Sequence, residues 1–394
     1  MKIYNKIIVF GIGILTILFL FQYILFKGGF MNREKYEQIL KKANEMSEKK
    51  NYEKAENLLK KSIKYDIEGY YQLGIFYFSE LNDEKRAIKF FELGYKKGYI
   101  LSTLPLGDIY REKGDVEKAK EWYQKGVEEN ENSCNIQLAK IYMSEKKFNE
   151  AEKVLLEIEN IEKNGEAIYN LFIISYLKND KKNMDKWENK LFNETLVEDI
   201  NEDMINNIKY IKGSDKDKKF FNQINDANNF AFLGNYNIAE NKLKDAIKIN
   251  EKDGYYELGK LYYYILKKDL AKKILEKSYE LGNFQSLSII GRIEEDNEKI
   301  EKAKEIYKIG VEKEDRESIF NLGAIYEEED NDIENAIIIY NKGMALKDAR
   351  SIYNLVHIYE KLGEEEEVKK LKNKILFEKG LIYLEYDMIN YAKK

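Results

Sequence analysis

The chain has 394 residues, which is more than one hydrophobic core usually serves, so we expect several domains or an elongated repeat array. Charged residues make up 35% of the chain and nearly cancel, at a net charge of -5, which is not the composition of a disordered or polyanion-binding chain. One cysteine, Cys134, and one histidine, His357, exclude an intramolecular disulfide framework and leave few ligands for zinc or iron. We therefore expect no metal and no cofactor.

The first predicted element is a membrane-spanning helix over residues 7–26, which read IIVFGIGILTILFLFQYILF and carry no charge. Twenty helical residues span roughly 30 Å, the thickness of the hydrocarbon core of a bilayer. The alternative is a cleaved signal peptide, whose apolar region is usually shorter and is followed by a small-x-small site. No such site follows Phe26, so we predict an uncleaved single-pass anchor within residues 1–30.

The orientation of this anchor is open on sequence grounds. Positive charges lie on both sides of the span, with Lys2 and Lys6 before it and more lysines and an arginine after it. The charge balance alone would keep the large domain inside the cell, whereas a span this close to the start commonly translocates the domain that comes after it. We expect a cell-membrane protein whose soluble domain is extracytoplasmic.

A repeated motif dominates the chain after the anchor. Strings of the form L-G-x-x-Y recur, and an alanine, or Val368 after the last copy, follows the second residue of each string by twelve or thirteen residues. Successive alanines are 32 residues apart over much of the chain, a regularity that indicates a repeat architecture. The motif copies begin at Leu73, Leu106, Leu138, Leu258, Leu322 and Leu355, and the alanines are Ala55, Ala87, Ala119, Ala151, Ala239, Ala271, Ala303 and Ala336.

Each repeat unit is predicted to be two amphipathic helices, because its apolar residues fall at helical spacing. Glycines in breaks such as Lys113-Gly114-Asp115 and Leu362-Gly363-Glu364 are expected to end the first helix. The glycine of the L-G string lies inside a helix, where it costs about 1 kcal/mol relative to alanine. We expect close approach of the paired second helix to compensate, with the recurring alanine facing the gap.

This pattern, L-G-x-x-Y and then A-x-x-x-F/Y, resembles the tetratricopeptide repeat, and the strings at Ala119–Gly126 and Ala303–Gly310 also resemble the Sel-one-like repeat. The period of 32 is shorter than the ~34 residues of the tetratricopeptide repeat, and the proline that usually ends a unit is missing. The resemblance implies an all-α, right-handed superhelical solenoid of about ten helix-turn-helix repeats that binds a protein or peptide on its concave face.

The alanine series repeats with a shift of 184 residues, which predicts a first block of repeats at 31–192 and a second at 220–376. Between them, residues 193–219 form an insertion with an extra helix, containing Leu196 to Ile211 at helical spacing, and a short linker. The insertion is either a tolerated addition or a hinge. Residues 377–394 are predicted to form a helix that caps the last unit.

No strong catalytic motif is present: the chain lacks a glycine-rich phosphate loop, a nucleophile elbow, HExxH and paired CxxC. Basic residues are scattered and offset by acids, which excludes nucleic acid, and we expect no small-molecule substrate. The acidic run Glu327–Asp332 is read as a solvated loop, with a calcium site as the alternative. We expect a binding scaffold and not an enzyme; the alternatives are an accessory or regulatory subunit of a membrane enzyme complex, and a hydrolase that uses groove carboxylates.

The candidate partner-binding residues are those that flank the L-G-x-x-Y positions and point away from the second helix. Aromatic side chains with scattered cations suit peptide capture, because rigid tyrosines bury area at low entropic cost. The alternative is that these tyrosines pack between repeat units. The predicted set is Tyr71, Ile75, Phe78, Tyr256, Lys260, Tyr263, Tyr264, Arg292, Phe320, Tyr353 and His357.

Overall fold

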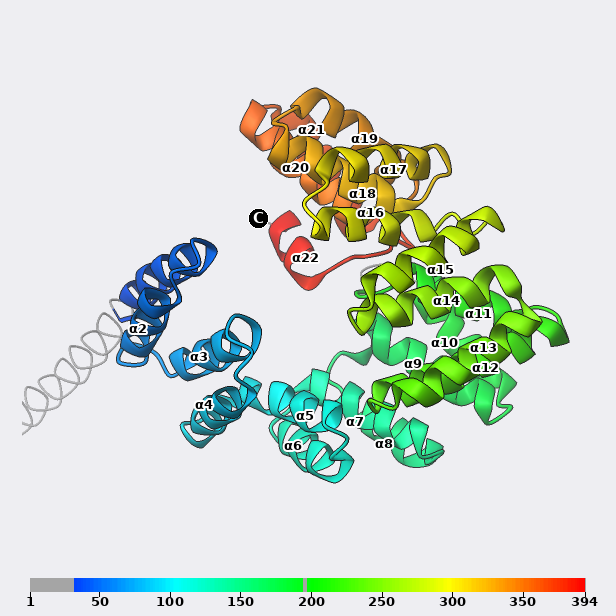
Figure 1. Cartoon of the computed structure of the whole chain (residues 1–394), viewed down its shortest axis with the longest axis horizontal. Helices are drawn as coiled ribbons and strands as arrows, with labels where there is room; N and C mark the ends of the chain where they lie inside the picture. The colour runs from blue at the N-terminus through cyan, green and yellow to red at the C-terminus, as the bar shows by residue number, and fades with distance from the viewer. Residues whose placement is uncertain (1–31, 194–196, 394) are drawn as a thin grey trace, which may run out of the picture. The chain divides into compact units, whose positions relative to one another are not determined.

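The computed structural model describes residues 32–193 and 197–393, and these residues are almost entirely helical (Figure 1). Within these two ranges no helix is both long and apolar enough to cross a bilayer. The predicted anchor at residues 7–26 lies outside the described residues.

Five helix pairs follow one another in the first part of the described chain. Each pair begins a few residues after the preceding pair ends, as a repeat period of 32 residues requires. They are residues 32–48 with α2 (Tyr52–Ser62), α3 (Glu68–Ser79) with α4 (Glu84–Lys96), α5 (Thr103–Glu112) with α6 (Val116–Glu128), α7 (Asn132–Ser144) with α8 (Phe148–Leu156), and α9 (Gly165–Leu177) with α10 (Lys181–Asn193).

A single helix, α11 (Glu202–Lys212), interrupts the alternation, and five more pairs and a short last helix come after it. The all-α repeat architecture with about ten helix pairs is thereby confirmed for the described residues. The later helices are α12 (Asp215–Phe232) with α13 (Tyr236–Ile249), α14 (Glu251–Tyr264) with α15 (Lys268–Glu280), α16 (Ser286–Asp296) with α17 (Ile300–Glu312), α18 (Arg316–Ala324) with α19 (Ile333–Ala345), α20 (Ala349–Leu362) with α21 (Glu365–Phe377), and α22 (Tyr386–Ala392).

The chain divides into two compact units. The first unit comprises the residues up to Tyr110 together with Glu117–Cys134, and the second comprises Arg111–Val116 with Asn135–Lys394. This division lies near α5–α7, whereas the predicted blocks 31–192 and 220–376 follow the sequence repetition. The insertion therefore lies inside the second unit and does not separate the two units.

The glycine of the L-G string allows the two helices of a pair to pack closely. A Cβ atom added to Gly74 would collide with the Phe91 ring, and one added to Gly107 would collide with the Tyr123 ring. Each ring lies four residues after the recurring alanine, and the alanines themselves are fully buried. The predicted close approach of the paired helix is confirmed, and an aromatic ring of the second helix fills it. The same contact recurs at Gly291 and Gly323.

A second glycine series sits between successive pairs. Gly126 on α6 leaves room for the side chains of Cys134 on α7 and Thr103 on α5, and Gly310 and Gly343 face Ser318 and Ser351 in a similar way. Cys134 is buried and acts as a packing residue in this position. Gly114 and Gly363 have φ of +77°, so the predicted breaks do use the left-handed conformation that glycine tolerates.

The insertion and the C-terminal segment are less helical than predicted. The extra helix begins only at Glu202, so Ile200 lies in an extended segment, and Leu196 lies outside the described residues. The predicted capping helix over 377–394 is restricted to Tyr386–Ala392. Leu381 and Leu384 are buried from an extended backbone, because residues 382–384 make hydrogen bonds to other segments in place of helical ones.

Candidate binding face of the second unit

Two non-helical segments, Val197–Asn201 and Gly380–Glu385, run together across the second unit, and we call them the clasp. The amide of Asp199 donates to the carbonyl oxygen of Leu384 at 2.9 Å, and the amide of Tyr383 donates to that of Ile200 at 2.7 Å. The clasp therefore joins two segments that are about 180 residues apart in the chain by backbone hydrogen bonds.

Each end of the clasp is fastened to the start of a repeat helix. Glu198 forms a parallel bridge with Asn164, whose side chain caps the N-terminus of α9. Ile382 forms a parallel bridge with Asp348, whose side chain caps α20. The first helices of two distant repeats are thus connected through the insertion and the C-terminal segment.

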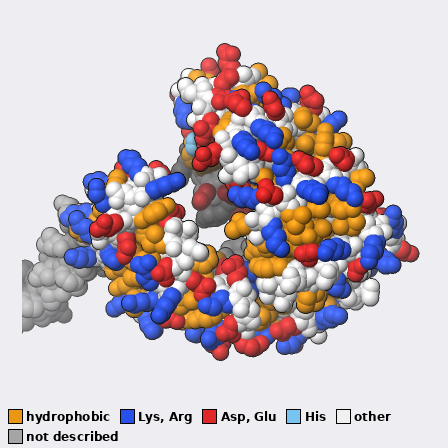
Figure 2. Space-filling view, in the orientation of Figure 1, with side chains coloured by type: hydrophobic (Ala, Val, Ile, Leu, Met, Phe, Trp, Pro, Cys, Tyr) orange, Lys and Arg blue, Asp and Glu red, His pale blue; other side chains and the backbone are white. Residues whose placement is uncertain are grey.

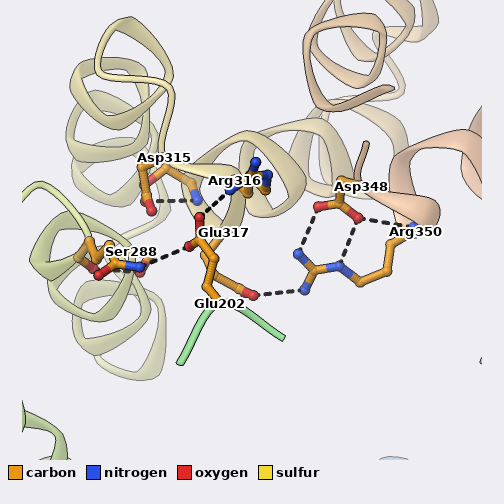
Figure 3. Close-up of polar contacts among 9 residues, drawn as sticks. Glu202, Ser288, Asp315, Arg316, Glu317, Asp348 and Arg350 are labelled. Carbon is orange, nitrogen blue, oxygen red and sulfur yellow. Dashed lines mark hydrogen bonds and ion pairs between the residues drawn. The ribbon is translucent and has the colours of Figure 1, made fainter. Parts of the chain in front are cut away.

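A polar network extends from the clasp to the starts of α16 and α18 (Figure 3). The Glu202 carboxylate accepts a hydrogen bond from Gln285 Nε2 at 3.0 Å and forms an ion pair with Arg316. Arg316 also donates to the carbonyl oxygen of Leu346 at 2.9 Å. Because charge-assisted hydrogen bonds hold both carboxylate oxygens of Glu202, α11 begins at a fixed place against the repeats.

Arg350 at the start of α20 ties the C-terminal segment to the same region. Its guanidinium donates to both carboxylate oxygens of Asp348, at 3.1 and 2.8 Å, and to Glu317 at 3.0 Å (Figure 3). The guanidinium carbon also lies 3.6 Å from the centroid of the Tyr383 ring. Such a stacked, desolvated cation contributes about 2 kcal/mol.

A pocket of about 350 Å³ lies beside this network and is lined from α14 and α16; we call it the tyrosine pocket. Five of the predicted residues line it together: Tyr256, Lys260, Tyr263, Tyr264 and Arg292. The sequence reasoning missed the other lining residues, many of which come from the insertion, the clasp and the helix starts: Asn201, Glu202, Asp203, Gln285, Ser288, Ile289, Asp315, Glu317 and Tyr383.

The five predicted residues differ in exposure. Tyr264 is 56% exposed, whereas Tyr256 is only 9% exposed. Lys260 forms ion pairs with Asp203 at 2.9 Å and Glu257 at 3.0 Å. Burial by itself lowers the pKa of Lys260, but these two carboxylates raise the pKa above its usual value, so Lys260 stays charged. Among the five, the exposed side chains are therefore Tyr264 and Arg292.

Asp315 adds a buried carboxyl to the pocket. Its Oδ2 accepts from the amide of Ser318 at 3.0 Å and so caps α18, while its Oδ1 is buried without a hydrogen-bond partner among the described residues. Burial raises the pKa of Asp315 to about 7, although the bonds from Ser318 oppose the shift.

Phe320, Tyr353 and His357 lie near the C-terminal segment and away from the tyrosine pocket. The Arg350 guanidinium covers the Phe320 ring at 4.4 Å. The Tyr391 ring of α22 packs against Tyr353 at 5.4 Å and against His357 at 4.6 Å between centroids. The chain's own last helix thus covers two of these three predicted residues.

Tyr71, Ile75 and Phe78 all lie on α3, in the first unit. The Tyr71 ring packs against Phe91 at 5.7 Å and Tyr99 at 5.3 Å, so it fills the space between helices. Phe78 is 41% exposed.

Potential metal ligands are spread apart in this part of the chain, and surface charges of both signs are mixed on the visible face. Among the described residues, no group of His, Cys, Asp or Glu side chains is placed to hold a metal ion. Figure 2 shows acidic and basic side chains interspersed over the visible face, with hydrophobic side chains between them. A polyanion binds best to an unbroken basic stripe.

Comparisons with known proteins agree with this architecture. Residues 106–133, which cover α5 and α6, match the family model described as a tetratricopeptide repeat. No curated protein matches the chain in sequence.

Several solved structures are similar to the chain at low identity. One is a tetratricopeptide repeat protein from Parabacteroides merdae, with 15% identity and a TM-score of 0.36, covering 65% of this chain and 98% of that one. Another is yeast Tom70, with 12% identity and a TM-score of 0.38, covering 92% and 95%. The third, the APC/C hetero-tetramer Cut9–Hcn1, has 14% identity and a TM-score of 0.33, covering 91% and 76%.

These TM-scores are low, so the three structures carry no argument about this chain. The family model matches residues 106–133, and the described residues around them form an all-α succession of helix pairs of the same kind.

Proposed function

We propose that the chain is a membrane-anchored scaffold that binds a protein or peptide partner through the concave face of its solenoid, in cell-envelope assembly or secretion. Tetratricopeptide repeats typically mediate contacts between proteins, and this chain has the repeat. The anchor is the apolar segment at residues 7–26, and the repeat domain is on the extracytoplasmic side.

One observation carries the binding proposal. Tyr263, Tyr264 and Arg292, from two successive first helices, line one pocket. Tyr263 donates to Asp296 at 3.2 Å, and the Arg292 guanidinium lies 5.7 Å from its ring, so the ring is held in place before a partner arrives. Pre-positioned aromatic side chains with one face open to solvent are the kind of residues that dominate binding energy at protein interfaces.

Site-specific photo-crosslinking in intact cells tests the proposal. A photoreactive phenylalanine analogue in place of Tyr264 is expected to give a discrete protein adduct that disappears when Tyr263→Ala is added. The same analogue in place of Ile338 on α19, which is 55% exposed, is the matched control and should give no such adduct. Equal adducts at both positions would show that the tyrosine pocket is not part of the binding surface.

Membrane orientation is tested separately. Protease added to spheroplasts should degrade the repeat domain if it is extracytoplasmic, and the domain should survive in sealed vesicles of inverted orientation. Full protection in spheroplasts contradicts the proposed orientation and leaves the binding proposal standing.

A further inference from the structure

The tyrosine pocket contains one carboxyl group that no cation of the described chain neutralises. Asp315, the N-cap residue of α18, lines the pocket and is 4% exposed (Figure 3). Its Oδ2 accepts from the amide and the hydroxyl of Ser318, whereas its Oδ1 has no hydrogen-bond partner among residues 32–193 and 197–393. A buried carboxyl oxygen without a donor is costly, so this atom points to a ligand that brings a donor.

The cations around Asp315 are already paired, and two of them hold two carboxylates each. The pairs are Lys260 with Asp203 and Glu257, Arg316 with Glu202, and Arg350 with Glu317 and Asp348. Three cations thus serve five carboxylates, and Asp315 is a sixth. Arg292 also lines the pocket, but it is exposed and its guanidinium lies 5.7 Å from the Tyr263 ring. The surroundings of the pocket therefore carry an excess of negative charge.

We propose that the tyrosine pocket binds the ammonium group of a lysine side chain of the partner, with Asp315 as its counter-ion. This inference rests on the proposed function and names the chemistry that would recognise the partner. Asp315 precedes its helix and is not among the partner-binding residues predicted from the sequence, so the proposed contact lies outside the repeat motif.

The aromatic walls of the pocket suit both parts of a lysine side chain. Tyrosine rings attract a cation that lies within about 6 Å of the ring centroid. Two rings of the pocket already hold cations of the chain, since Lys260 lies 4.7 Å from the Tyr256 centroid and Arg350 lies 3.6 Å from that of Tyr383. Tyr264 is 56% exposed, so its ring is open to an incoming side chain. The four-carbon stem of lysine can pack on such a ring while its charged end reaches deeper.

The hydrogen bonds of Asp315 favour an ammonium group over a guanidinium group. Arginine binds a carboxylate best through two parallel N–H donors, one to each oxygen. Ser318 occupies Oδ2, which leaves Oδ1 as the open acceptor. An ammonium group is a compact charge that needs one such acceptor. An anionic ligand is disfavoured because it would meet an unpaired carboxylate.

The titration of Asp315 links such binding to pH. Burial raises the pKa of Asp315 to about 7. A bound ammonium group favours the ionised carboxylate, so below pH 7 binding must release a proton, and the affinity should rise with pH. The charged side chains that line the pocket with Asp315 are Glu202 and Asp203 from the start of α11, Lys260 from α14, Arg292 from α16 and Glu317 from α18.

The first test titrates n-butylammonium, which is the stem and charged end of a lysine side chain, into the full-length protein in a neutral detergent. Saturation-transfer difference NMR gives the Kd for the wild type, Asp315→Asn and Asp332→Asn. Asparagine is as good an N-cap as aspartate, so both variants keep their fold. Asp332→Asn is the matched control, since Asp332 caps α19 in the same way and does not line the pocket.

Asp315→Asn should raise the Kd at least tenfold, because a charge-assisted hydrogen bond is lost, and Asp332→Asn should leave the Kd unchanged. Arg292→Ala should lower the Kd, because it removes a like charge. From pH 6 to pH 8 the affinity of the wild type should rise roughly tenfold, whereas that of Asp315→Asn should stay constant. 1-Butanol has the same stem without the charge and should bind both proteins equally weakly.

The second test asks whether the ammonium group belongs to a protein. The photoreactive analogue in place of Tyr264 is combined with Asp315→Asn or with Asp332→Asn in intact cells. The adduct should be lost with Asp315→Asn and kept with Asp332→Asn.

Four results would overturn the inference. If n-butylammonium binds Asp315→Asn as tightly as the wild type, Asp315 is not a counter-ion, and the crosslinking at Tyr264 still decides the proposed function. If butyrate binds and Arg292→Ala weakens it, the pocket takes an anion. If the adduct needs Tyr263 but survives Asp315→Asn, the proposed function stands and the lysine contact is wrong. If n-butylammonium binding depends on Asp315 but no adduct forms, the pocket takes an ammonium ion that is not part of a protein partner, and the proposed function fails with the inference.

Discussion

The amide of Tyr383 donates to the carbonyl oxygen of Ile200 at 2.7 Å, and this hydrogen bond, together with that from Asp199 to Leu384, joins the C-terminal segment to the insertion. Tyr383 adopts this place with φ of +58°, a left-handed conformation that is costly for a bulky residue. Its ring compensates by stacking on Arg350. Substitutions at Tyr383 can therefore separate the energetic cost of the backbone conformation from the stabilisation by the side-chain contact.

Tyr383→Gly and Tyr383→Ala should both lower the thermal midpoint, because each loses the stack on Arg350. The glycine variant should be the more stable of the two by about 1–2 kcal/mol, since glycine tolerates the left-handed conformation. In both variants, hydrogen exchange should speed up at residues 197–201 as well as at 381–385. An alanine variant at least as stable as the glycine variant would contradict the strained conformation.

Asp315→Asn should change how stability depends on pH. The folded-state pKa of about 7 is above the unfolded value of about 4, so the folded protein binds a proton that the unfolded chain has released between these values. Stability from this group is therefore present below about pH 4 and is lost as the pH rises to about 7.

Asparagine keeps the cap on α18 and removes this titration. Between pH 4 and pH 8, the free energy of unfolding of the variant should therefore rise relative to that of the wild type by up to about 4 kcal/mol. Urea unfolding of both proteins across this range measures the difference. A constant difference at all pH values would show that Asp315 is ionised throughout.

Gly107→Ala should destabilise the first unit although alanine favours helix. The added methyl group would meet the Tyr123 ring, and overpacking of this kind typically costs about 1–3 kcal/mol. Gln124→Ala, at an exposed position on α6, should change the free energy of unfolding by less than about 0.5 kcal/mol. Thermal unfolding of the three proteins gives the comparison; a stabilised Gly107→Ala variant would mean that the helices of the pair are not in close contact.

Glu202→Ala should cost about 1–3 kcal/mol, because Arg316 and Gln285 lose their shared acceptor while remaining partly buried. Glu301→Ala is the control, since the Glu301 side chain is 84% exposed in its pair with Lys304 and its removal should be nearly neutral. Denaturant midpoints that fall equally in both variants would show that the Glu202 network adds no stability.

The repeat itself could be predicted because its signals are local. The spacing of Ala87 and Ala119, and the glycine that precedes each aromatic contact, are fixed by packing within one helix pair. The sequence even indicated that Gly107 needs a close neighbour. It did not indicate which side chain fills the gap.

The clasp could not be predicted from local patterns. Leu381, Ile382 and Leu384 have spacing that is compatible with one face of a helix, but they are buried from an extended segment whose partners lie about 180 residues away. Pairing over such a distance leaves no periodic trace in either segment. Five of the site residues on α14 and α16 were predicted as a set because both helices carry the repeat motif.

The start of α11 has a further consequence, since Asn201 and Asp203 line both the tyrosine pocket and a second pocket, of about 310 Å³, between α7, α9, α11 and α12. A ligand that moves this shared wall in one pocket alters the other, and by thermodynamic reciprocity each occupant then changes the affinity of its neighbour by the same factor. The insertion thereby gives these two pockets a common wall, so a substitution at Asn201 or Asp203 changes the lining of both at once.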